Sequence, residues 1–207
     1  MNHDAPPMRA RLGILLGGSG STYANLAACC AAGTLPAEIA VVIGHKPGLG
    51  GLAKAQAHGH PAVVAADAAA VTAALSAHAA QWVAMCGWIR YWDPPPPFAG
   101  RTVNVHPSLL PSFGGQGMYG AKVHAAVLAH GCRISGCTVH LVQGGYDTGP
   151  ILAQAAVPVA VDDTPETLAA RVQAAERELY PRALAALLAG CWHDTPHGRR
   201  LNLDQRP

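Results

Sequence analysis

Asn104 and His106 are two polar residues whose side chains suit group-transfer chemistry. They belong to the octet NVHPSLLP (104–111), which follows a short apolar run after a turn. This places them at or just past the carboxyl end of a predicted strand, where open α/β sheets bind ligands. Residues two apart on a strand point to the same side. An amide that can donate to an oxygen, beside an imidazole that titrates near neutral pH, suits acyl transfer.

Taken singly, either residue is explained as well by a polar strand end, with a capping Asn and a surface His. The complete octet favours a functional site, because a partner for it occurs later in the chain.

That partner is Asp147, at the apex of the loop QGGYDTGP (143–150). The glycines of this loop allow backbone conformations that are closed to other residues. A carboxylate held close to His106 would favour the imidazolium and raise its pKa. The alternative is an Asx-turn residue, which is common for Asp in such loops.

A glycine-rich loop, GGSGST (17–22), separates a predicted strand from a predicted helix. Such a loop presents backbone N–H groups and the positive end of the helix dipole to an anion. The Walker lysine is missing, and Tyr23 stands where the dinucleotide fingerprint needs a third glycine. A monophosphate is therefore the favoured ligand, and a plain flexible turn is an equally weighted alternative.

Two further groups of residues have an ambiguous pattern. Trp88, Tyr91 and Trp92 gather near the expected ligand edge, either as a flat-ring pocket or as ordinary packing. Gln173 and Glu176 are three apart and share one face of a predicted helix, which could equally be a solvated face.

The elements that must position these residues alternate along the chain. Strands are expected at 11–16, 39–43, 62–65, 82–86, 102–103, 134–142 and 151–159, and helices at 23–32, 49–58, 68–79, 121–130 and 164–190. This alternation predicts a doubly wound α/β sheet with mainly parallel strands. Pro181 is expected to kink or restart the last helix, and the tail at 193–207 to be a loosely packed extension. The Gly-rich segment 112–120 is expected either to move over the site or to form a long turn.

Composition limits the class of protein. A length of 207 residues suits one α/β domain. Of these residues, 50% are hydrophobic and 13% are charged. No stretch is long and apolar enough to span a membrane, and the first ten residues lack a signal core, so a cytoplasmic protein is expected. A net charge of +2 without basic clusters argues against nucleic acid and favours small-molecule substrates. No CxxC or HExxH pattern occurs, so no metal site is expected.

Together, the octet, the Gly-rich loop, the segment YDTGP (146–150) and the helix segment RVQAAERELYP (171–181) resemble the phosphoribosylglycinamide formyltransferase family of folate-dependent formyltransferases. The resemblance covers about residues 11–190. It implies a doubly wound, mostly parallel seven-stranded α/β sheet with helices on both faces. It also implies a single domain, with a Rossmann-like nucleotide-binding half at about 11–100, a folate and catalytic half at about 101–190, and tails at 1–10 and 193–207.

The resemblance further implies a role for each matching residue. The catalytic residues would be Asn104, His106 and Asp147. The phosphate of a ribonucleotide would be bound by Gly20, Ser21 and Thr22, and the rest of that ribonucleotide by Pro107, Gln173 and Glu176. The folate would be bound by Trp88, Ile89, Arg90, Tyr91, Asn104, Gln143, Gly144, Gly145, Tyr146 and Asp147.

The implied activity is direct transfer of a formyl group from 10-formyltetrahydrofolate, as co-substrate and without a metal, to the amine of glycinamide ribonucleotide in purine biosynthesis. Asn104 and a protonated His106 would stabilise the oxyanion, and Asp147 would hold His106 charged. The partners would be these small molecules, with no nucleic acid or membrane, and the protein would be a monomer or homodimer.

The chain departs from the family pattern in three places. Thr22 stands where Asn is frequent, the segment 114–120 is longer and richer in glycine, and the helix 68–79 lacks an arginine that some members place near the folate tail. The alternatives are a formyltetrahydrofolate deformylase, a formyltransferase for another amine, and a nucleotide-binding module without catalysis. Since only about ten residues precede the first strand and the chain ends soon after the last helix, the extra domains of the deformylase and of methionyl-tRNA formyltransferase are not expected.

Overall fold

The computed structural model describes residues 9–196 and 198–203. Its elements follow the order β1 (Ala10–Leu16), α1 (Ser21–Ala31), β2 (Ala37–Gly44), α2 (Gly50–Ala57), β3 (Ala62–Val64), α3 (Ala68–Ala77), β4 (Trp82–Cys86), β5 (Thr102–His106), α4 (Ala121–Ala129), β6 (Ile134–Leu141), β7 (Ile151–Pro158), α5 (Pro165–Leu188), β8 (Trp192–Thr195) and β9 (Gly198–Leu201). No helix within the described residues is long and apolar enough to cross a membrane.

Seven strands form one sheet in the order β3-β2-β1-β4-β5-β6-β7. The strands from β3 to β5 are parallel, and β6 and β7 are antiparallel to their neighbours. The chain winds outward from β1 to β3 and then returns to place β4 on the other side of β1. This switch opens a crevice at the carboxyl ends of β1 and β4. The predicted fold class, a mostly parallel seven-stranded α/β sheet, is confirmed.

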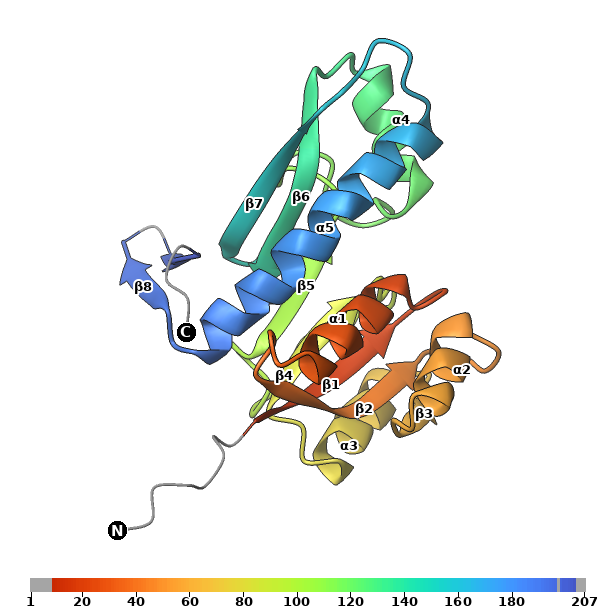
Figure 1. Ribbon diagram of the computed structural model, residues 1–207, viewed down its shortest axis with the longest axis vertical. Coiled ribbons are helices and arrows are strands. Elements are labelled where there is room, and N and C mark those ends of the chain that lie inside the picture. The colour runs from red at the N-terminus through yellow and green to blue at the C-terminus, as the bar shows by residue number, and fades with distance from the viewer. Residues whose placement is uncertain (1–8, 197, 204–207) are drawn as a thin grey trace.

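Apolar side chains bury both faces of the sheet. On one face Val71 and Leu75 of α3 pack with Phe98, which lies in the loop between β4 and β5. On the other face α1, α2 and α5 supply a larger cluster that includes Leu26, Leu52 and Leu184. Figure 1 shows α5 running along the sheet from the loop after β7 to β8. The helices therefore cover both faces, as expected.

The expectation that Pro181 restarts the last helix is wrong, because α5 is continuous from Pro165 to Leu188. A proline inside a helix leaves the carbonyl four residues earlier without its N–H partner. Here that carbonyl belongs to Arg177, and the Asn25 side-chain amide of α1 donates to it at 2.9 Å. The neighbouring helix thus replaces the bond that Pro181 cannot make.

The expectation of a loosely packed tail after residue 193 is also wrong for the described part. β8 and β9 form an antiparallel hairpin. Trp192 and Leu201 pack against the main core, so the hairpin extends the buried surface beyond the end of α5. Of the expected tails, residues 1–8 and 204–207 lie outside the described residues.

The Asn25 bond can be tested by a double-mutant cycle with Pro181. Asn25→Ala should lower the free energy of unfolding by about 1 kcal/mol or more, because it leaves the Arg177 carbonyl without a partner. In a Pro181→Ala background, the backbone N–H at position 181 can satisfy that carbonyl, so Asn25→Ala should cost clearly less. Urea unfolding of the four proteins gives the coupling energy. Equal costs in both backgrounds would contradict the compensation.

Candidate active site

A cavity of about 460 Å³ opens at the carboxyl ends of the central strands. Its walls come from the start of α1, the exits of β4 and β5, the Gly-rich segment before α4, the loop after β6 and the middle of α5. The lining residues are Thr22, Gly87, Trp88, Ile89, Asn104, Val105, His106, Pro107, Gly115, Gln116, Gly117, Met118, Tyr119, Gly120, His124, Tyr146, Asp147, Gln173 and Glu176. Most of the residues singled out in the sequence therefore meet in one place.

Asp147 lies between two imidazoles at one side of this cavity. Its Oδ2 is 3.4 Å from His106 Nδ1, and its Oδ1 is 3.5 Å from His140 Nε2. The backbone N–H of Gly115 donates to Oδ2 at 3.0 Å. The predicted approach of Asp147 to His106 is thus present in the structure, and His140 adds a neighbour that the sequence analysis missed.

Asn104 joins the group from the middle of β5, directly opposite His140 of β6. Its Nδ2 is 3.1 Å from His140 Nε2 and 3.5 Å from Asp147 Oδ1. His140 Nδ1 faces the Leu141 carbonyl at 2.9 Å, and its Nε2 faces both the Asn104 amide nitrogen and the Asp147 carboxylate. The amide hydrogens of Asn104 are thereby directed at the protein, which leaves Oδ1 as the atom available to a ligand.

The loop after β6 is shaped to place Asp147. Asp147 has a φ of 56°, a left-handed conformation that Asp tolerates better than most residues. A Cβ on Gly149 would collide with the Leu141 carbonyl oxygen, so a side chain there would push the loop away from β6. Thr148 Oγ1 lies 3.1 Å from the carbonyls of Gln143 and Gly145, which closes the loop on itself.

The loop after His106 is fixed by a buried polar network. Thr138 Oγ1 donates to the Ser108 carbonyl at 2.7 Å and accepts from Leu110 N at 3.0 Å. Gln154 Nε2 reaches both Thr138 Oγ1 and the Leu110 carbonyl. β6 and β7 therefore hold the loop whose Phe113 carbonyl lies 2.8 Å from His106 Nε2.

The pKa of His106 is lowered, contrary to the expectation that Asp147 raises it. Burial of the ring, which is only 4% exposed, is the largest cause and opposes the charged form. The carboxylate of Asp147 and the Phe113 carbonyl favour the charged form, but by less. Both ring nitrogens face acceptors, an arrangement that only the imidazolium satisfies completely. The acceptors around His106 thus favour the imidazolium, while burial of the ring favours its neutral form.

For Asp147, the interactions with neighbouring groups outweigh the effect of burial on its pKa. Burial would raise its pKa, but the hydrogen bond with His140, the charge of His106 and the Gly115 N–H outweigh burial and lower it. The carboxylate therefore stays ionised at neutral pH in a largely enclosed position.

The Gly-rich loop leads into α1 without a side-chain cap. Gly20 is left-handed, with a φ of 75°, and a Cβ there would lie 2.5 Å from Gly51 Cα. A small cleft of about 20 Å³ beside the first turn is lined by Ser21, Thr22, Asn25, Gln173, Glu176 and Arg177. Uncapped N–H groups with two hydroxyls at a helix start suit an anion, and the phosphate site expected at this loop stays a prediction.

Glu176 lies at the boundary between this cleft and the main cavity. Burial raises its pKa to about 7, and the charge of Arg177 only partly opposes the rise. The carboxyl group is therefore partly protonated near neutral pH and can both donate and accept hydrogen bonds.

The residues expected at the folate side divide between two spaces. Ile89 lines only the main cavity. An adjoining space of about 50 Å³ is lined by Met85, Trp88, Arg90, Tyr91, Trp92, Asn104, His140, Val142, Gly144, Gly145, Tyr146 and Asp147. Gln143 lines neither space. Tyr91 and Tyr146 meet edge to face, with ring centroids 5.5 Å apart, and Tyr91 donates to the Gly144 carbonyl at 3.2 Å.

The sequence analysis did not identify His124 and His140 as site residues. His140 could have been found by pairing β5 with β6 in antiparallel register, which sets it opposite Asn104. His124 follows the Gly-rich segment, and its place depends on the path of that segment. Among residues 9–196 and 198–203, no group of three or more His, Cys, Asp or Glu side chains is arranged to hold a metal ion.

Known proteins resemble this chain over most of its length. Residues 10–184 match the family model described as formyl transferase. Phosphoribosylglycinamide formyltransferase of Mycobacterium tuberculosis H37Rv is 40% identical over 193 residues, which cover 88% of this chain and 86% of that protein. The chloroplastic phosphoribosylglycinamide formyltransferase of Arabidopsis thaliana is 36% identical, over 87% of this chain, and the chain spans only 66% of that protein's length. The crystal structure of glycinamide ribonucleotide transformylase 1 from Symbiobacterium toebii superposes with a TM-score of 0.87 at 34% identity, covering 97% of this chain and 98% of that one.

The raised pKa of Glu176 predicts a pH-dependent effect of Glu176→Gln on stability. A folded-state pKa above the unfolded value gives stability that is present at low pH and lost as the pH rises through about 7. The variant escapes this loss, so at pH 8 it should be more stable than the unsubstituted protein by roughly 1–3 kcal/mol. At pH 4, below the ordinary pKa of a glutamic acid side chain, the two should differ little.

Denaturant unfolding at both pH values measures this difference. Glu178→Gln, at an exposed position two residues along the same helix, is the matched control and should show no pH-dependent gain. A Glu176→Gln variant that is no more stable than the unsubstituted protein at pH 8 would show that burial does not raise this pKa.

Proposed function

Because the chain belongs to the formyl transferase family, we propose that it transfers the formyl group of 10-formyltetrahydrofolate to the primary amine of glycinamide ribonucleotide. The relatives named above act on phosphoribosylglycinamide by their names. The observation that carries the proposal is the meeting of Asn104, His106 and Asp147 at one side of the cavity of about 460 Å³.

The reaction needs one bond to form and one to break. The amine nitrogen attacks the formyl carbon, the carbonyl electron pair moves to the oxygen, and the tetrahedral intermediate then collapses with loss of N10 of the folate. One proton leaves the amine and one arrives at N10. The negative charge on the oxygen is the feature that the site must stabilise.

His106 would stabilise that oxygen. Its Nδ1 is 3.4 Å from Asp147, longer than the 2.7–2.9 Å typical of a tight charge-assisted bond. A protonated Nδ1 can therefore turn to an oxyanion while Asp147 balances its charge. Asn104 Oδ1 would accept an N–H of the amine and orient its lone pair, a role that differs from the oxyanion donor expected from sequence. Asp147 would carry the proton from the amine to N10.

The proposal places the two substrates one after the other along the rest of the cavity. The phosphate would bind at Gly20, Ser21 and Thr22, where α1 starts without a cap. The ribose hydroxyls would meet Pro107, Gln173 and Glu176. The folate would lie against Trp88, Ile89, Arg90 and Tyr91 on one side and Gly144, Gly145, Tyr146 and the backbone of Gln143 on the other.

The proposed halves, at about 11–100 and 101–190, both contribute to each substrate. Trp88 and Arg90 precede the boundary but belong to the folate side, and Gln173 and Glu176 follow it but belong to the ribonucleotide side. We therefore propose one catalytic domain with a shared cleft, in which neither half binds a substrate alone.

Hydrolysis of formyltetrahydrofolate is the alternative reaction for the same three residues. The two are separated by following tetrahydrofolate formation by ultraviolet absorbance, with and without glycinamide ribonucleotide. Product that requires the ribonucleotide establishes transfer. Equal product without it would establish a hydrolase instead.

Substitution of His106 and Asp147 tests the assignment of the catalytic residues. His106→Ala and Asp147→Asn should each lower kcat by about 10²–10⁴-fold, because each removes a group that acts in the transition state. His193→Ala and Asp162→Asn, at exposed positions, are the matched controls and should keep full activity. Circular dichroism checks that each variant is folded. A folded His106 or Asp147 variant with near-native turnover would refute the assignment.

A further inference from the structure

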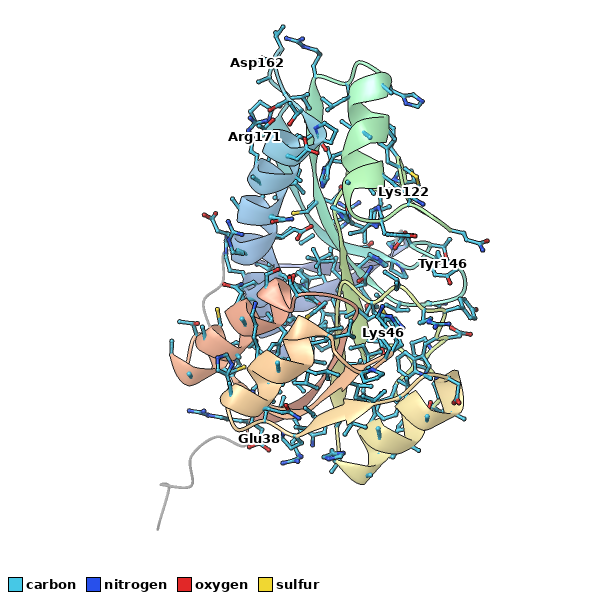
Figure 2. The ribbon with its side chains drawn as sticks, turned by 90° about the vertical axis from the view of Figure 1, so that its right-hand side faces the viewer. Glu38, Lys46, Lys122, Tyr146, Asp162 and Arg171 are labelled. Atoms are coloured by element: carbon cyan, nitrogen blue, oxygen red, sulfur yellow. The ribbon has the colours of Figure 1, made fainter. Side chains whose placement is uncertain are left out.

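His124 is a buried polar residue in the main cavity to which the mechanism assigns no role. It lies in the first turn of α4, is 2% exposed and lines the cavity together with His106 and Glu176. Its Nδ1 is enclosed and has no hydrogen-bond partner among the described residues. Figure 2 shows that the start of α4, marked by Lys122, and Tyr146 lie on the same side of the molecule. The helix thus presents His124 to the ligand space and not to the core alone.

An unpartnered buried nitrogen is costly, at about 1–3 kcal/mol, and few remain in folded proteins. Besides His124, the described residues include three such atoms, which are His45 Nδ1, Trp88 Nε1 and Ser135 Oγ. Of these, only Trp88 also lines the cavity, and it already belongs to the proposed folate side. His124 therefore lines the cavity with one ring nitrogen, Nδ1, enclosed and unpaired in the protein, so its other ring nitrogen, Nε2, is the atom that a ligand can reach.

The position of its proton follows from its surroundings. Burial lowers the pKa of His124, and the nearby His106 lowers it further, so the ring is neutral at neutral pH. A neutral imidazole carries one N–H and one lone pair. An enclosed N–H without an acceptor is rarer than an unpaired acceptor, so the proton belongs on Nε2 and the lone pair on Nδ1. Nε2 is not among the enclosed atoms and forms no bond within the described protein.

We propose that His124 is a substrate-binding residue whose Nε2–H donates to an oxygen of the ribonucleotide, either a ribose hydroxyl or the glycinamide carbonyl. This inference rests on the proposed function. His124 shares the main cavity with Thr22, Gln173 and Glu176 but is absent from the adjoining space lined by Arg90, Tyr91, Gly144 and Gly145. An uncharged donor also suits this place, because a cation would repel the ammonium form of the substrate amine.

The test compares His124→Leu with His124→Gln. Leu removes the donor, so the Kd and KM for glycinamide ribonucleotide should rise about tenfold, the loss expected for one hydrogen bond. The KM for formyl folate should stay within about twofold, a change too small for a lost hydrogen bond. Gln can place its amide N–H near the position of Nε2, so it should restore most of the affinity. Calorimetry of the ribonucleotide without folate gives Kd directly, and His193→Leu is the exposed control.

Thermal unfolding separates a binding role from a structural one. Leu removes an unpartnered buried nitrogen, so the Leu variant should unfold at or above the Tm of the unsubstituted protein while binding the ribonucleotide less tightly. If the Leu variant does not fold, His124→Asn, whose shorter amide does not reach the Nε2 position, takes its place against Gln. A stable variant with weak binding supports the proposal.

Three results would overturn it. These are an unchanged ribonucleotide Kd in the Leu variant, an equal rise in both KM values, or a Gln variant as weak as Leu. These three results count against the proposal only if the unsubstituted enzyme transfers formyl groups to the ribonucleotide. If that enzyme does not catalyse the transfer, the proposed function itself fails.

Discussion

The structure of the site depends on keeping one carboxylate, that of Asp147, charged in a largely enclosed position. Burial alone would protonate it. His106, His140 and the Gly115 N–H supply the counterbalancing interactions, and they come from β5, β6 and the segment before α4. Asn104 adds a further donor from β5. No single element of the chain can hold this carboxylate, so the antiparallel pairing of β6 on β5 and the path of the Gly-rich segment are both required.

The backbone around the Asp147 carboxylate can approach its neighbours closely because glycines stand at the tightest contacts. Gly149 lets the loop pass against the Leu141 carbonyl, and Gly114 lies where a Cβ would be 2.5 Å from Leu110 and 3.3 Å from Asp147. The Thr138 hydroxyl holds the loop after His106 through its hydrogen bonds with the Ser108 carbonyl and the Leu110 N–H. On the opposite side, Tyr180 of α5 places its hydroxyl 3.1 Å from the Met85 carbonyl and 2.9 Å from the Val103 carbonyl, which ties the long helix to the two strands that carry the site. Glu176 lies one turn before Tyr180 on the same helix.

Sequence patterns predicted the sheet, most element boundaries and the residues that meet at the strand ends, because these depend on local periodicity and on the rule that parallel strands end at one edge. Predictions from sequence patterns failed where a residue distant in sequence, or burial by the fold, changed the outcome expected from local residues. Pro181 does not break α5, because Asn25 of another helix satisfies the carbonyl that the proline leaves unpaired. The pKa of His106 was predicted in the wrong direction, because pairing with Asp147 was considered without the cost of burying the ring. His140 and His124 were missed because strand register and the path of segment 112–120 cannot be derived from periodicity.

The lowered pKa of His106 is compatible with a catalytic role if the substrate supplies the proton. Glu176 is shifted toward its neutral form, and His106 and His124 are also neutral, so Asp147 is the full negative charge that an incoming ligand meets in the cavity. Such a field favours binding of the ammonium form of an amine, which cannot attack a carbonyl until it loses a proton. Neutral His106 would take this first proton of the ammonium group, while Asp147 would carry the second proton, lost after the attack, to N10. The resulting imidazolium is the form that the Phe113 carbonyl and Asp147 both satisfy. We infer that burial of His106 keeps it ready to accept the proton, and that the same proton then stabilises the oxyanion formed in the next step.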